Sequence, residues 1–139
     1  MIDHFSLGVR DLDRAGAFYD AVLAPLGYVR IVAWGAVANH AYRSLAYGPP
    51  GANAEGTEGE APLNLEERSD ATPAGSGFHM CFKAPDRAAV HAFHAAGLAH
   101  GGADKGPPGL REHYGPGYYA AFLLDPEGWW IEAVTYNPR

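Results

Sequence analysis

Cysteine is almost absent from this sequence, since Cys81 is the single cysteine among 139 residues. One cysteine excludes an internal disulfide, and such sparse cysteine usage fits a reducing compartment. The N-terminus also lacks a basic segment followed by an apolar stretch, so it shows no signal peptide. We therefore expect a cytoplasmic protein.

Long apolar runs and basic clusters are missing as well. The longest apolar run, residues 118–124, is far shorter than the roughly 18 residues that a membrane span needs. The formal net charge is −6, and no Lys/Arg cluster exists to follow a phosphate backbone. We expect neither a membrane nor a nucleic acid as partner. The composition, 47% hydrophobic and 19% charged, is ordinary for a globular protein, and the length suits a single domain over residues 1–139.

The first segment reads as a strand followed by a helix. Residues 3–9 alternate strictly between apolar and other side chains, which predicts a half-buried strand with His4 on the less apolar face. Asp11 is placed to cap a helix over about 11–23, where apolar residues recur at helical spacing. Pro25 disfavours helical geometry in the residue before it, so the helix ends there.

Three further strands complete this half. Residues 28–34 and 41–47 read as strands, and a short one is expected around residues 63–65. The intervening residues 48–61 contain four glycines and three glutamates, which predicts an exposed loop.

The pattern then starts again with a constant offset of 75 residues. The offset relates His4 to His79, Asp11 to Asp86, Phe18 to Phe93, Leu23 to Leu98 and Gly27 to Gly102. We interpret this correspondence as an internal duplication, with one module over about 1–70 and a second over about 76–139.

The second half also ends in two strands. A helix is expected over about 86–98, followed by a loop over 101–117 in which nine of 17 residues are Gly or Pro, as in a mobile flap. Residues 118–125 and 129–136 read as strands joined by the tight turn Asp-Pro-Glu-Gly at 125–128.

Four side chains with metal-binding chemistry fall on the sheet face opposite the helices: His4, His79, Cys81 and Glu132. Glu132 stands between apolar neighbours in the last strand and needs a partner, because burial of an unpaired charge is strongly unfavourable. Two imidazoles and one carboxylate meeting in a concave sheet would be satisfied by a divalent cation. Such a three-ligand set leaves positions open for a chelating substrate.

Three stretches carry a family resemblance: residues 4–12, 77–80 and 122–132, the last with the motif Asp-Pro-Glu-Gly-x-x-Ile-Glu. They resemble the glyoxalase/bleomycin-resistance/extradiol-dioxygenase group of the vicinal-oxygen-chelate superfamily. The resemblance implies an α+β fold, in which two βαβββ modules form a curved mixed β-sheet cup with helices on its outer face.

The resemblance also implies a site and an assembly. His4, His79 and Glu132 would occupy the positions that bind a divalent metal ion such as Fe, Mn, Zn or Ni, and chains of this length commonly form homodimers. A fourth ligand position aligns best with Asn64, which is a poor ligand for the softer divalent metals. This departure favours a three-ligand site over that of glyoxalase I.

The predicted flap carries side chains suited to a small-molecule ligand. Arg111 could pair with a carboxylate, and we take His113 and Tyr114 as the candidate acid/base residues. Tyr118 is assigned to substrate binding, with Tyr119 beside it. The alternative is that these tyrosines anchor the loop by packing.

Further candidates lie outside the predicted flap. Trp130 and Cys81 complete the predicted substrate-binding set, although we interpret Cys81 as a small buried filler rather than a nucleophile. His91 and His94 lie three apart on a helix without a third ligand, which indicates a solvated face, and His40 and His100 read as surface residues near turns.

Three functions remain open from the sequence. The first is a metal-dependent lyase, isomerase or dioxygenase that acts on a small molecule chelating through two neighbouring oxygens. The second is a non-catalytic, bleomycin-resistance-like protein that binds a small molecule or antibiotic on Trp34, Trp129 and Trp130, with an acidic loop at 55–60 that favours a cationic ligand. A third possibility is a degenerate member of the family whose sheet surface mainly supports self-association.

Overall fold

The computed structural model describes residues 2–34, 41–51 and 62–139. The first half of the chain forms β1 (Phe5–Val9), α1 (Leu12–Leu23), η1 (Ala24–Leu26), β2 (Val29–Trp34), β3 (Ser44–Gly48) and β4 (Leu63–Glu67). The second half forms β5 (Met80–Lys83), α2 (Arg87–Ala99), β6 (Ala103–Leu110), η2 (Glu112–Tyr114), β7 (Tyr119–Leu124) and β8 (Trp130–Thr135).

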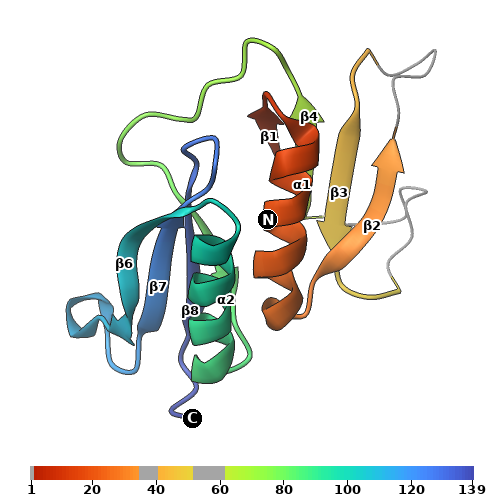
Figure 1. Cartoon of the computed structure of the whole chain (residues 1–139). Coiled ribbons are helices and arrows are strands. Elements are labelled where there is room, and N and C mark those ends of the chain that lie inside the picture. Colours follow the sequence, from red (N-terminus) through yellow and green to blue (C-terminus); the bar gives the residue numbers. More distant parts are fainter. Residues whose placement is uncertain (1, 35–40, 52–61) are drawn as a thin grey trace.

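Each half contributes its own four-stranded sheet (Figure 1). The strand order is β1-β4-β3-β2 in the first sheet and β5-β8-β7-β6 in the second. β1 runs parallel to β4 and β5 runs parallel to β8, while the other neighbours are antiparallel. The predicted α+β class with two βαβββ modules is therefore confirmed.

Both helices begin at the predicted caps. The Asp11 carboxylate accepts a hydrogen bond from the backbone N–H of Arg14 at 2.9 Å, and the Asp86 carboxylate accepts one from Ala89 at 2.8 Å. These bonds satisfy amides that have no partner within the first helical turn. The turn after η1 closes at Gly27, whose φ of 85° favours a residue without a side chain.

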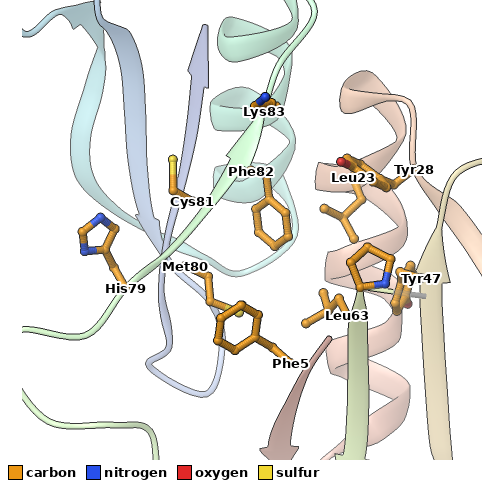
Figure 2. A pocket seen from close by; sticks show the side chains of 11 residues that line it. Phe5, Leu23, Tyr28, Tyr47, Leu63, His79, Met80, Cys81, Phe82 and Lys83 are labelled. Atoms are coloured by element: carbon orange, nitrogen blue, oxygen red, sulfur yellow. The ribbon is translucent and has the colours of Figure 1, made fainter. Parts of the chain in front are cut away.

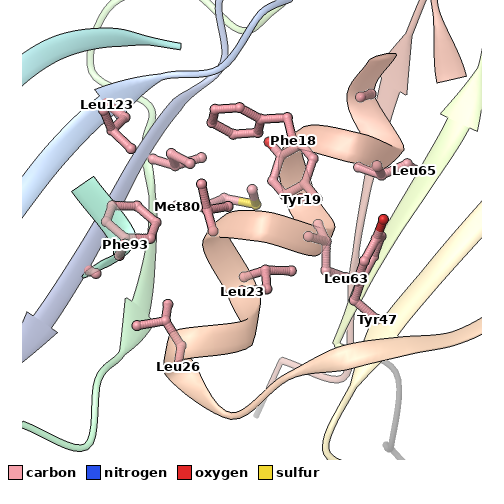
Figure 3. Packing of buried hydrophobic residues seen from close by; sticks show 14 of the residues in the cluster. Phe18, Tyr19, Leu23, Leu26, Tyr47, Leu63, Leu65, Met80, Phe93 and Leu123 are labelled. Atoms are coloured by element: carbon pink, nitrogen blue, oxygen red, sulfur yellow. The ribbon is translucent and has the colours of Figure 1, made fainter. Parts of the chain in front are cut away.

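The two helices pack against each other, and the apolar core is continuous across both modules (Figures 1 and 3). Phe18 of α1 and Phe93 of α2 are both fully buried, in keeping with the offset of 75 residues. The correspondence weakens at the helix ends, where Leu23 is buried but Leu98 is 46% exposed. Because α1 and α2 each cover one face of a sheet, the opposite face of each sheet is left open for other contacts.

A turn of the second module fastens it to the first. Asp125 is 4% exposed, and its carboxylate accepts hydrogen bonds from the backbone N–H groups of Glu127 at 2.9 Å and Trp129 at 2.8 Å. The same carboxylate accepts a 2.8 Å bond from the buried Tyr19 hydroxyl of α1. The Trp129 indole N–H donates to the Gly8 carbonyl of β1 at 3.0 Å. Burial raises the pKa of both Tyr19 and Asp125.

The prediction of a flap over residues 101–117 is wrong. This segment forms β6, which pairs antiparallel with β7, and then the short helix η2. Among the described residues β6 is the outer strand of its sheet and pairs on one edge, and an outer strand tolerates prolines such as Pro107 and Pro108. The register shifts on both sides of Gly106 absorb the irregular backbone.

Some predictions fall on residues that the structure does not describe. Residues 52–61, which include the acidic loop at 55–60, and His40 lie outside the described ranges. Within those ranges, no helix combines the length and apolar character that crossing a bilayer would require.

We expect Tyr19→Phe to lower the free energy of unfolding by about 1 to 3 kcal/mol, because it removes a hydrogen bond to a buried carboxyl group. The change is measured by urea denaturation. Tyr136→Phe is the matched control, since Tyr136 is 63% exposed. Equal unfolding midpoints for the two variants would show that the bond to Asp125 does not hold the modules together.

Candidate functional site

Glu132 is a buried carboxylate on an interior strand. It lies on β8, between β5 and β7, and is 1% exposed. Its chain neighbours Ile131 and Ala133 join the core against the helices, so Glu132 projects from the open face of the sheet. In the strand register Glu132 stands opposite Phe122 of β7 and Cys81 of β5.

Two side chains satisfy this carboxylate. Oε1 accepts a hydrogen bond from the Tyr118 hydroxyl at 2.5 Å, and Oε2 lies 3.0 Å from Nε2 of His79. Burial, followed by the hydrogen bond to Glu132, raises the pKa of Tyr118 well above its ordinary value. The phenol therefore stays protonated at neutral pH and remains a donor.

Aromatic rings surround the carboxylate and form a hollow of about 310 Å³, which we call the aromatic pocket. It is lined by His79, Tyr114, Tyr118, Phe122, Trp130 and Glu132. The His79 ring centroid lies 5.3 Å from that of Trp130 and 6.1 Å from that of Phe122. The Tyr114 and Tyr118 centroids are 5.2 Å apart on the other side. Buried polar atoms within an apolar wall are typical of small-molecule sites.

Two cations lie over rings of this pocket. The Arg111 guanidinium carbon is 5.7 Å from the Phe122 ring centroid, and Nζ of Lys105 is 5.4 Å from that of Trp130. Arg111 donates hydrogen bonds to the backbone carbonyls of Pro107, at 2.6 Å, and Leu110. Within residues 2–34, 41–51 and 62–139, neither cation forms an ion pair with a carboxylate.

The predicted substrate-binding residues largely gather here. Tyr118 and Trp130 line the aromatic pocket, and Arg111 lies over its Phe122 wall. Cys81 is exposed, so its interpretation as a buried filler is wrong. Desolvation and the nearby Glu132 carboxylate raise the pKa of the Cys81 thiol to about 12. The thiol is therefore protonated at neutral pH and a poor nucleophile.

The two predicted acid/base residues are placed differently from each other. Tyr114 of η2 lines the aromatic pocket and is 61% exposed. His113 stacks on Tyr114 with centroids 4.1 Å apart but is not part of the pocket wall. The hydroxyl that touches Glu132 belongs to Tyr118 instead.

Tyr119 and the helix histidines form contacts away from the pocket. Tyr119 packs against the core, and its hydroxyl lies 2.7 Å from Nε2 of His91. The expectation of a solvated face is wrong for His94, which is 9% exposed and lies 2.9 Å from the Asp104 carboxylate of β6. His100 is exposed, as expected, and Nδ1 contacts the carbonyl oxygen of Ala96.

A single chain does not unite the three expected metal ligands. His79 and Glu132 meet, but His4 precedes β1 in the other sheet, where its ring is 54% exposed and lies 2.6 Å from Asp3. Asn64 lies on β4 of that same sheet. No group of three His, Cys, Asp or Glu side chains in the described part of the chain could hold a metal ion. The reason is that β1 and β5 are outer strands of separate sheets.

An apolar groove separates these two outer strands (Figure 2). It has a volume of about 380 Å³, and its walls include Phe5, Leu63, Met80 and Phe82. Figure 2 shows that His79 and Cys81 point to the other side of β5 from Met80 and Phe82. Met80 and Phe82 therefore give the groove its apolar wall on this side, while His79 lines both the groove and the aromatic pocket. Phe5 is 40% exposed at the groove.

Sequence reasoning missed three groups: Phe122, Lys105 and the hydroxyl contact of Tyr118. The alternation of side chains along a strand could have identified two of them. Phe122 stands opposite Glu132 in the register, and Tyr118, four residues before Phe122, lies on the same face of the sheet. Lys105 gave no comparable signal, since its segment read as a loop. Trp129, predicted as a stacking surface, instead packs beside Phe78 and donates to Gly8. The side chain of Trp34 lies outside the described part of the structure.

Comparison with solved structures extends over nearly the whole chain. A glyoxalase/bleomycin resistance protein from Albidiferax ferrireducens T118 is 30% identical, with a TM-score of 0.74 over 95% of each chain. Glyoxalase I from Zea mays is 22% identical, with a TM-score of 0.69 over 96% of this chain and 45% of that one. The fosfomycin resistance protein FosX from Listeria monocytogenes is 15% identical, with a TM-score of 0.63 over 94% of this chain and 88% of that one.

A search of curated proteins gave no match. The sequence model of one family, described as the Glyoxalase/Bleomycin resistance protein/Dioxygenase superfamily, matches residues 1–133. That match covers most of the chain, and the paired βαβββ modules agree with it, so this protein belongs to the Glyoxalase/Bleomycin resistance protein/Dioxygenase superfamily.

Proposed function

We propose that this protein is a divalent-metal-dependent enzyme that acts on a small, metal-chelating substrate in the aromatic pocket. The observation that carries the proposal is the pair formed by Glu132 and His79. A fully buried carboxylate and an imidazole lie 3.0 Å apart and open toward one pocket. The reaction would be a lyase, isomerase or dioxygenase step in the cytoplasm.

The chemistry of this pair suits a shared metal ion. Nε2 of His79 and Oε2 of Glu132 lie 3.0 Å apart, close enough for one divalent ion to be held by both. Imidazole and carboxylate are also the donors that Zn, Fe, Mn and Ni sites employ. The residues present therefore fit two of the three expected ligand positions.

A second copy of the chain would supply the third ligand. β1 pairs only with β4, and β5 pairs only with β8, so each of these strands has one edge without a partner among the described residues. His4 precedes β1 as His79 precedes β5. A two-fold symmetric dimer that places β1 of one copy beside β5 of the other would bring the two histidines together twice.

The apolar groove between the modules supports this assembly. An unpaired strand edge can pair with a strand of another chain, and exposed apolar side chains mark association surfaces, so a partner's strand would satisfy both. Phe5 is 40% exposed at the edge of β1, and Met80 and Phe82 of β5 line the same groove. A homodimer is therefore part of the proposed function.

The chain's own residues divide the chemistry among them. A bound divalent cation would act as a Lewis acid toward two neighbouring oxygens of the substrate. Tyr118 holds the Glu132 carboxylate in place through its hydroxyl, at 2.5 Å. The rings of Phe122 and Trp130 line the pocket and would keep water from one side of a bound substrate. Tyr114, which is exposed at the rim, would give or take a proton from the substrate.

The aromatic lining also favours a second candidate, a non-catalytic protein that sequesters a small molecule. Five of the six lining residues carry rings, and aromatic faces can hold a planar ligand without metal. This second candidate would be favoured over the enzyme by a ligand that the protein leaves chemically unchanged and that stays bound when strong chelators are added.

Metal content tests the role of the pair. We expect the purified protein, after incubation with Mn, Ni or Zn and desalting, to retain about one ion per chain. Glu132→Gln keeps the shape of the side chain but removes its charge, and it should lower retention at least about tenfold. Glu112→Gln, on exposed η2, is the matched control. Full retention by Glu132→Gln would contradict the proposed site.

Mixing two inactive variants tests the shared site. His4→Ala and Glu132→Gln should each fail to bind metal, but a dimer made of one copy of each contains one site with all native ligands. Co-refolding equal amounts should restore roughly a quarter of the metal binding of the parent, because half of the dimers are mixed. A site built within one chain would give no recovery, and native mass spectrometry of the mixed dimers distinguishes the two results.

A further inference from the structure

We infer that the aromatic pocket selects a ligand with a flat aromatic body and one carboxylate, whose negative charge is bound by Arg111 and Lys105 at the rim. This inference names a substrate class and rests on the proposed function only for the location of the site. It does not require a metal ion, because the charged group of the ligand is bound by Arg111 and Lys105, which the proposed metal site does not use.

The first argument is the shape and chemistry of the lining. Five ring-bearing residues surround a volume of about 310 Å³, which is at the lower end of the roughly 300 to 1,000 Å³ that small-molecule sites occupy. The ring pairs are tilted or edge-on to one another, at 37° for His79 with Trp130 and 61° for Phe122 with Trp130. Rings in these orientations can contact a planar ligand of one or two fused rings both face-to-face and edge-to-face.

The second argument is charge. Arg111 and Lys105 lie over the rings of Phe122 and Trp130, and neither has a carboxylate partner among the described residues. The one carboxylate of the pocket, Glu132, is 1% exposed and already bound by Tyr118 and His79. An anionic ligand therefore finds unpaired positive charge at the rim, whereas a cationic ligand finds no accessible negative charge.

The third argument is the distance between the two ends of the site. Glu132 on β8 pairs with Phe122 on β7, and Phe122 pairs with Gly106 on β6. Neighbouring strands lie about 4.8 Å apart, so Gly106 is about 10 Å across the sheet from Glu132. The Arg111 guanidinium lies at this far end, where a Cβ on Gly106 would stand 3.3 Å from Nη2. A carboxylate held there is well separated from Glu132, with aromatic rings between them.

Glycine at two positions of β6 makes room for the guanidinium. A Cβ built on Gly109 would lie 3.0 Å from Nη1 of Arg111, and one on Gly106 would also lie 3.0 Å from the Phe122 ring. Arg111 is held over this strand by its bonds to the carbonyls of Pro107 and Leu110. The cation is thus positioned before any ligand arrives, which reduces the entropy lost on binding.

The probe is 2-naphthoate, and its binding is followed by calorimetry and tryptophan fluorescence. The protein is first stripped of metal with a chelator and then dialysed, so that no ion contributes. We expect 2-naphthoate to bind at least about tenfold more tightly than neutral 2-naphthamide, which lacks the charge, and cyclohexanecarboxylate, which lacks the aromatic rings. The cation benzyltrimethylammonium should not bind measurably. Equal affinity for the acid and its amide would overturn the inference.

Single substitutions then locate the contact. Arg111→Gln should weaken 2-naphthoate binding roughly tenfold, and Lys105→Gln should weaken it by a smaller factor because Lys105 is exposed. Neither change should alter the affinity for 2-naphthamide. Arg139→Gln, which removes an exposed charge outside the aromatic pocket, is the matched control. Parent-like binding by Arg111→Gln would place the acid elsewhere and overturn the inference.

The metal proposal and this inference fail in different ways. Naphthoate binding to metal-free protein together with an absence of metal retention would retain the inference and reject the metal site. The opposite result would be naphthoate binding that appears only after metal is added, is lost in Glu132→Gln and is unchanged in Arg111→Gln. That result would retain the metal site and reject the inference. The folded state of each variant is checked by its near-ultraviolet circular dichroism.

Discussion

The burial of one carboxylate is the constraint on which the site depends. Glu132 sits in the middle of a sheet with 1% exposure, where a charge without partners would be strongly destabilising. Within the described part of the chain, its two oxygens lie at hydrogen-bond distance from His79, just before β5, and from Tyr118, just before β7. These two contacts satisfy the carboxylate, and the rings of the aromatic pocket surround all three side chains. The same need of a buried charge for partners makes the pair suitable for a cation.

The packing of α1 against α2 determines which of the expected metal ligands a single chain can bring together. α1 and α2 pack on each other, and the Asp125 turn ties the second module to Tyr19 and Gly8. These contacts fix the modules through their helical sides and leave the outer strands β1 and β5 apart. His4 is consequently separated from His79 within the chain, although the two hold equivalent places in the modules. In the proposed dimer, His4 of one copy would lie beside His79 of the other, and the packing of α1 against α2 within each copy would be kept.

Much of the fold could be predicted from the sequence, because local chemistry dictates it. Asp11 and Asp86 cap their helices through hydrogen bonds to amides three residues further along the chain, so these caps do not depend on tertiary contacts. The alternation of side chains in the last strand likewise assigns Glu132 to one face of the sheet. β6 could not be predicted, since its glycines and prolines oppose strand formation and only pairing with β7 overrides them. The separation of His4 from Glu132 was also beyond reach, because it depends on how two modules pack and not on either module alone.

The prolines of β6 have a consequence for how copies of this protein can meet. Pro107 and Pro108 have no backbone N–H, and the register slips on each side of Gly106. A foreign strand approaching this side of the second sheet finds missing donors and a broken repeat, which discourages open-ended growth by edge-to-edge stacking. Extension of the second sheet by a further strand is therefore favoured at β5, the edge that the proposed dimer would use.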